Sequence, residues 1–185
     1  MAEKYDRAAE SLGNILHMEH VNLTIPEQEP AISFYISGLG MTRDPFLMTG
    51  VDNMWVNMGR TQLHLPSRDP FPQRFRGTLG IVVPDLNKTE ESLGAIENVL
   101  GGTKFSFVRK NNCIEATCPW GNQFRIHEPA PEYGTIHLGM PYLDLNAPLG
   151  SAEKIAHFYS EIIGAIAHVG IRNNATCASI STGNS

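Results

Sequence analysis

The sequence lacks long apolar runs and has no excess of basic residues. No run approaches the roughly 18 apolar residues of a membrane-spanning helix, and residues 1–15 have no apolar core of the signal-peptide type. The 14 Lys and Arg residues are scattered and outnumbered by 19 Asp and Glu residues, which argues against a nucleic-acid-binding surface. From these absences we expect a cytoplasmic protein whose partner is a small molecule, with no membrane or nucleic-acid contact.

Cysteine is also scarce. Cys113, Cys118 and Cys177 are an odd number, and they show no spacing typical of a metal site. We therefore expect structural thiols in a reducing compartment.

What the chain does contain is a repeated pattern of a short strand, a loop, and a helix that carries Phe-Tyr followed by Gly. The first copy comprises residues 20–25, Phe34, Tyr35 and Gly40, and the last copy comprises residues 140–145, Phe158, Tyr159 and Gly164. A weaker copy begins between them at residues 78–83. Repeats at this spacing indicate serial supersecondary units.

Each unit is predicted to be βαβββ, because strand-like alternation follows the helix three times. The predicted boundaries are a mobile lead-in at 1–14, a first module at 15–72, a second at 73–130 and an incomplete third at 131–185. Predicted strands lie at 20–25, 41–48, 54–58, 61–65, 78–83, 104–109, 113–117, 123–126, 165–171 and 175–181. Predicted helices run from Pro30 to Gly40, from about 87 to 100 with Asn87 and Glu90 as a capping box, and from Ser151.

The predicted fold class is α+β, with the first two modules packed as one cup and the helices on the outside. Residues expected between sheet and helices are Val21, Leu23, Phe34, Tyr35, Leu39, Leu93, Ile96, Phe124 and Ile126. In the third module, Ile155, Phe158, Tyr159 and Ile162 are expected to point inward.

The serial βαβββ repeat, the Phe34-Tyr35 pair and the turn Pro119-Trp120-Gly121-Asn122 resemble the vicinal oxygen chelate superfamily over residues 15–181. That superfamily includes glyoxalase I, bleomycin and fosfomycin resistance proteins, and extradiol dioxygenases. The resemblance implies paired modules that form a cupped cavity. It specifies chemistry poorly, because members catalyse many reactions and some only bind.

In such proteins the metal ligands come from the first and fourth strands of each module. Carried over, these positions are His20 and His64 in the first module, and Thr78 and Arg125 in the second. Imidazoles suit a divalent metal such as Zn, Fe, Ni, Co or Mn, whereas a guanidinium has no free lone pair for a metal. The candidates to complete the site are Gln62, Glu115 and His127.

Two alternatives stay open for these side chains. The histidines either hold a metal or are satisfied polar residues that line a cavity with no cofactor. Arg125 either binds a carboxylate or phosphate of the substrate, or forms an internal ion pair with Glu115. The predicted substrate-binding residues are Asn22, Gln62 and Arg125.

Two functions follow. One is a metal-assisted lyase, isomerase or dioxygenase acting on a small oxygen-bearing substrate, in which Glu115 is the catalytic group that moves a proton. The other is a metal-free module that binds a small molecule in order to sequester or sense it.

The third module lacks a fourth strand in this sequence. We expect residues 134–185 to be the opening of a second, truncated pair of modules. They would dock loosely on the first pair or form a homodimer through the incomplete C-terminal module. The competing hypothesis is that residues 165–181 fold back and complete a sheet within the monomer.

Overall fold

A computed structural model describes residues 15, 17–47, 52–67 and 70–183. The predicted lead-in at 1–14 and Met48 lie outside this range. The chain divides into two compact units, Glu19–Asn146 and a smaller unit made of Met1–Met18 with Ala147–Ser185. Each unit is described below by itself.

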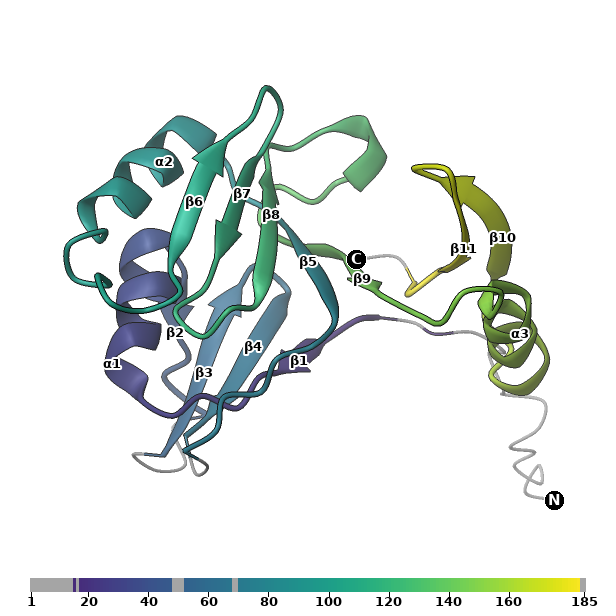
Figure 1. The fold of residues 1–185 in the computed structure, drawn as a ribbon, viewed down its shortest axis with the longest axis horizontal. Coiled ribbons are helices and arrows are strands. Elements are labelled where there is room, and N and C mark those ends of the chain that lie inside the picture. Colours follow the sequence, from purple (N-terminus) through teal and green to yellow (C-terminus); the bar gives the residue numbers. More distant parts are fainter. Residues whose placement is uncertain (1–14, 16, 48–51, 68–69, 184–185) are drawn as a thin grey trace, which may run out of the picture. The chain divides into compact units, whose positions relative to one another are not determined.

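The first part of the large unit has the predicted βαβββ order. Its elements are β1 (His20–Asn22), α1 (Gln28–Ala31), the π-helix η1 (Ile32–Gly38), β2 (Thr42–Arg43), β3 (Asn53–Met58) and β4 (Thr61–Pro66). The strands form a four-stranded sheet in the order β1-β4-β3-β2, and β1 runs parallel to β4. This places β1 at one edge of the sheet (Figure 1).

The second part repeats this order and then adds a strand. It comprises β5 (Gly77–Val82), α2 (Leu86–Ala95), β6 (Ser106–Arg109), β7 (Ile114–Thr117), β8 (Gln123–His127), the short helix η2 (Pro131–Tyr133) and β9 (Gly139–Leu145). The sheet order is β6-β7-β8-β5-β9, with β9 antiparallel to β5. The predicted α+β fold class is thereby confirmed.

The strand pairing differs from the expected one at the edge of the second sheet. The two modules keep separate sheets, and the edge of β5 pairs with β9, which is the first strand of the third copy. The hypothesis that residues 165–181 fold back and complete a sheet within the monomer was wrong. Within the described ranges, the strands β10 (Ala167–Arg172) and β11 (Ala175–Ile180) pair only with each other, and the strand that extends the second sheet is β9.

The two modules of the large unit pack through their helices. The ring of Phe34 contacts the rings of Tyr35, Phe105 and Phe124, with centroids 4.9 to 5.8 Å apart. The π-helix η1, which continues α1, is in contact with α2 (Figure 1). The helices and the inner faces of the sheets thus share one core.

Eight of the nine predicted core residues are buried: Leu23, Phe34, Tyr35, Leu39, Leu93, Ile96, Phe124 and Ile126. The prediction was wrong for Val21, which is partly exposed because β1 is an edge strand. The predicted capping box was also wrong. The carboxylate of Asp85 caps α2 by accepting hydrogen bonds from the backbone N–H groups of Asn87 and Lys88, at 2.8 and 3.0 Å.

The small unit contains α3 (Ala152–His157), the π-helix η3 (Phe158–Ile162), β10 (Ala167–Arg172) and β11 (Ala175–Ile180). The last two form a hairpin across Asn173 and Asn174, whose positive φ angles suit a tight turn. The inward orientation expected for Phe158 and Ile162 was wrong, since their side chains are 48% and 70% exposed. Among the described residues, no helix is both long and apolar enough to span a bilayer.

Candidate functional site

One face of the first sheet is polar and aromatic. The parallel register of β1 and β4 sets His20 beside Gln62 and Asn22 beside His64, so that all four side chains point to one face. Trp55 on β3 lies opposite His64, and the two rings stack with centroids 4.0 Å apart. The predicted neighbours on β1 and β4 are therefore brought together.

The ring nitrogens of both histidines have partners within this face. Nδ1 of His64 contacts Oδ1 of Asn22, and Nε2 contacts Oδ1 of Asn53. Nδ1 of His20 lies 2.9 Å from a carboxylate oxygen of Glu19, and Nε2 accepts a hydrogen bond of 3.3 Å from the Asn22 amide. All four nitrogens are thus engaged by neighbours of the same chain.

Gln62 is held in place by a second network on the same face. Its side-chain amide donates to Asp44 at 3.0 Å and to Asn57 at 2.6 Å. The backbone N–H groups of Leu47 and Phe46 also donate to Asp44, and these bonds hold the pKa of that carboxyl below its usual value. Asp44 is therefore a charged acceptor that fixes Gln62 in one orientation.

These residues do not by themselves fit a metal ion. The rings of His20 and His64 have centroids 6.4 Å apart, and their nitrogens are already bonded. Within the described ranges, no group of three or more His, Cys, Asp or Glu side chains is arranged to hold a metal. Two imidazoles are fewer than the four ligands of a closed zinc site. Glu115 and His127 belong to the other sheet.

The second sheet carries its own polar row, which crosses four strands. The register aligns Glu115 on β7, Arg125 on β8, Gly80 on β5 and Tyr142 on β9. Nη2 of Arg125 lies 3.4 Å from Oε1 of Glu115, so the ion pair that the sequence left open is present. Lys110 approaches the other carboxylate oxygen of Glu115 at 3.9 Å.

Gly80 makes room for Tyr142 in this row. A Cβ atom on Gly80 would lie 2.2 Å from Cζ of Tyr142, so the tyrosine ring lies across the backbone of β5. The phenol oxygen lies 2.8 Å from Nε2 of His127, and Arg125 interacts with the same oxygen. The ring of Tyr133 stands 5.1 Å from that of His127 and 6.4 Å from that of Tyr142.

The charges of this row are set by burial. Burial raises the pKa of Tyr142 to about 12, although Arg125 acts in the opposite direction. Burial lowers the pKa of His127, and the positive charge of Arg125 lowers it further. Near neutral pH the row therefore presents a neutral phenol and a neutral imidazole beside the ion pair of Arg125 with Glu115.

Comparison with known proteins agrees with this architecture. The structure is similar to that of a protein named as a dioxygenase from Bacillus subtilis subsp. subtilis str. 168, with a TM-score of 0.57 and 13% identity over 89% of this chain and 63% of that one. The chain has the vicinal oxygen chelate fold. No family model and no curated protein matches its sequence.

Two further structures are similar to a shorter part of this chain. A protein assigned to the glyoxalase family from Bacillus anthracis has a TM-score of 0.45 and 20% identity over 63% of this chain and 97% of that one. A member of the glyoxalase/bleomycin resistance protein/dioxygenase superfamily from Sphaerobacter thermophilus has a TM-score of 0.43 and 18% identity over 62% and 98%. One fold supports many functions, so the side chains of the site indicate the function better than the fold does.

Within the vicinal oxygen chelate fold of this chain, three residues of the second polar row were not foreseen. Tyr142 and Tyr133 come from the segment after the second module. Gly80 has no side chain, so the sequence alone does not indicate that it contacts Tyr142. The available signal was the spacing of Tyr142 and Asp144, which places these two polar residues of β9 on one face.

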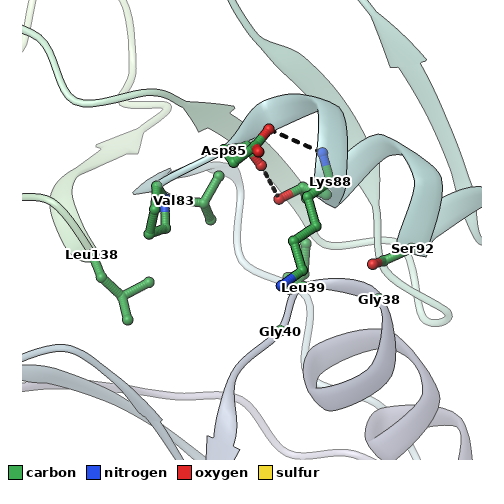
Figure 2. A pocket seen from close by; sticks show the side chains of 10 residues that line it. Gly38, Leu39, Gly40, Val83, Asp85, Lys88, Ser92 and Leu138 are labelled. Atoms are coloured by element: carbon green, nitrogen blue, oxygen red, sulfur yellow. Dashed lines mark hydrogen bonds between the residues drawn. The ribbon is translucent and has the colours of Figure 1, made fainter.

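A hollow of about 240 Å³ lies elsewhere on this fold, where the end of η1 meets the start of α2 (Figure 2). None of its lining residues belongs to either polar face. Asp85 caps α2, and the hydroxyl of Thr89 donates to the backbone carbonyl of Asp85 at 2.9 Å. These polar groups are therefore used by the helix terminus itself.

Proposed function

We propose that this protein binds a small molecule carrying a carboxylate or a comparable oxyanion on the polar face of the second sheet, with Arg125 as the anchor. The observation that carries the proposal is the state of the Arg125 side chain. It is 40% exposed, bonded to Glu115 through a single nitrogen at 3.4 Å, and in contact with the phenol oxygen of Tyr142. A guanidinium has five N–H donors in a planar fork, so donors remain for a ligand.

The neighbours of Arg125 suit such a ligand. Tyr142 remains protonated at neutral pH and can donate a hydrogen bond from the same row. The rings of His127 and Tyr133 supply flat apolar surface beside the charge. Charge-assisted bonds to a planar fork are stronger than neutral ones, which favours an oxyanion over a neutral group.

Benzoate is a suitable probe, because it joins a carboxylate to a flat ring, and benzamide is its neutral analogue. Calorimetric titration should show that the wild-type protein binds benzoate more tightly than benzamide. Arg125→Gln should weaken benzoate binding by about 10-fold or more, since a hydrogen bond to a charged group contributes roughly 1.5–3 kcal/mol. Benzamide binding should change little.

Arg109→Gln is the matched control. Arg109 lies on β6 of the same sheet and pairs with Glu90 of α2 at 3.7 Å, which places it on the helix-covered face. Both substitutions remove one positive charge. Equal loss of benzoate binding in the two variants would mean that net charge, rather than the Arg125 fork, holds the anion.

The metal-assisted reaction, with Glu115 moving a proton, stays a prediction. Glu115 lies in the second sheet, whereas His20 and His64 lie in the first. Measurement of the bound metal after purification without chelators tests whether His20 and His64 bind a metal. Near-stoichiometric metal that is lost in a His20→Ala/His64→Ala variant would favour metal binding, whereas the same metal content in wild type and variant would not.

A further inference from the structure

We propose that the ligand of the second polar row is a zwitterion, an α-amino carboxylate with a flat ring. Arg125 binds its carboxylate and Glu115 binds its ammonium group. This ligand class rests on the proposed function, because Arg125 remains the anchor of the carboxylate. The new element is the second charge of the ligand and the role of Glu115 in recognising it.

Glu115 and Arg125 present two opposite charges side by side. They face each other on β7 and β8, where directly opposite residues have Cβ atoms about 4.5–5.5 Å apart. Both side chains reach solvent, with 43% of Glu115 and 40% of Arg125 exposed. An α-amino carboxylate carries the complementary two charges on groups attached to one carbon atom. It can therefore bind both side chains at once.

The ion pair is loose enough to admit such a ligand. Nη2 of Arg125 and Oε1 of Glu115 are 3.4 Å apart, whereas charge-assisted N–H···O bonds are about 2.7–2.9 Å long. Nζ of Lys110 lies 3.9 Å from the other carboxylate oxygen, which is too far for a hydrogen bond. An ammonium group thus already approaches this oxygen without bonding to it. The ammonium group of a ligand can come closer.

Glu115 also disfavours an acid that has no ammonium group. A carboxylate bound to Arg125 lies next to the carboxylate of Glu115, and like charges in neighbouring positions repel each other. An ammonium group on the adjacent carbon of the ligand replaces this repulsion with an attraction. The preference for an amino acid over the corresponding acid should therefore depend on Glu115.

The aromatic residues are placed for the ring of the same ligand. The strand order β7-β8-β5-β9 puts Tyr142 on the opposite side of Arg125 from Glu115. The rings of His127 and Tyr133 are 5.1 Å apart, and both contact the ring of Tyr142. The row thus offers an ammonium site, a carboxylate site and a flat apolar surface in that order.

Three ligands that share one ring test this order. Phenylalanine carries both charges, 3-phenylpropionate lacks the ammonium group, and phenethylamine lacks the carboxylate. Calorimetric titration of the full wild-type chain should show that phenylalanine binds about 10-fold or more tightly than 3-phenylpropionate, because a hydrogen bond between charged groups is added. Phenethylamine should also bind more weakly than phenylalanine, since it cannot use Arg125.

Glu115→Gln is the decisive variant. It should bind phenylalanine and 3-phenylpropionate with nearly equal affinity, because the amide no longer attracts the ammonium group and Arg125 still holds either carboxylate. Glu90→Gln is the matched control. Glu90 pairs with Arg109 at 3.7 Å on the helix-covered face of the same sheet, so this substitution removes the same charge from another ion pair. The control should keep the wild-type preference for phenylalanine.

The outcomes separate this ligand class from the anion site on which it rests. Equal binding of phenylalanine and 3-phenylpropionate by the wild type would overturn the zwitterion and leave the Arg125 anchor in place. A preference that Glu115→Gln retains, or that Glu90→Gln loses equally, would also overturn the role of Glu115. Binding of neither acid would overturn both proposals. If Glu115→Gln fails to fold, the comparison of the three ligands on the wild type still decides.

Discussion

Gly80→Ala tests the packing of the polar row of the second sheet. A Cβ at position 80 would lie 2.2 Å from Cζ and 2.3 Å from Cε1 of Tyr142, whereas carbon atoms in contact are about 3.5–4.0 Å apart. The tyrosine ring therefore has to move by more than about 1 Å. This movement breaks its 2.8 Å contact with His127. Overpacking of this kind costs about 1–3 kcal/mol.

Urea unfolding measures this loss, with Gly94→Ala as the matched control. A Cβ on Gly94 meets nothing within 4 Å, and the residue lies in α2. The control should be equal to wild type or more stable by up to about 1 kcal/mol, because alanine favours helix. A lower free energy of unfolding for Gly80→Ala, together with an equal or higher one for Gly94→Ala, would show that the effect comes from the clash with Tyr142.

Spectrophotometric titration of the tyrosines gives an independent result, with Tyr142→Phe used to assign the transition. The transition near pH 12 in wild type should move toward 10 in Gly80→Ala, because the displaced ring is less buried. A Gly80→Ala protein with wild-type stability and an unchanged Tyr142 transition would refute the packing described here.

Three further outcomes are expected. Phe34→Ala should lower the free energy of unfolding by about 3–5 kcal/mol, because the ring is fully buried, whereas Phe158→Ala, at the same position of the repeat but 48% exposed, should have a much smaller effect in the same urea assay. His127 has a lowered pKa in the folded protein, so its contribution to stability should be complete above its unfolded pKa of about 6.5 and decrease as the pH falls below it. Urea unfolding at several pH values should show a weaker decrease in His127→Gln, and identical profiles would contradict the assignment. Asp85→Ala should cost about 1 kcal/mol through loss of the α2 cap, and Asn87→Ala should cost less; the reverse order would restore the capping box predicted from the sequence.

The alternation of polar and apolar residues predicted each sheet face well. His20 and Asn22 share a face with Gln62 and His64 because side chains alternate along a strand, and this pattern is visible in the sequence. The ion pair of Glu115 with Arg125 was open to the same reasoning, since a short turn joins β7 and β8.

The partners of the first strands could not be read in the same way. β1, β5 and β9 carry similar local patterns, so nothing within any one of them specifies which two will pair. β5 and β9 lie far apart in the sequence, so their pairing depends on the fold as a whole rather than on a local pattern. Tyr142 was missed for this reason, because its place beside Arg125 depends on that pairing.

Periodicity also could not predict whether an apolar face is covered. Phe34 and Phe158 have the same place in the repeat, yet only Phe34 is buried, because Phe105 and Phe124 of the second module pack on it. The sequence shows which residues share a face of a helix. The surface that covers that face comes from another part of the fold.

The anchoring of an oxyanion by Arg125 can be observed most directly in the arginine Nε–Hε region of the ¹H–¹⁵N NMR spectrum. The signal absent from Arg125→Gln identifies Arg125, and that absent from Arg109→Gln identifies Arg109. Addition of benzoate is predicted to shift the Arg125 signal along a saturable curve while the Arg109 signal stays in place. An Arg125 signal that does not move while benzoate binds, or that moves equally with benzamide, would contradict the proposed site.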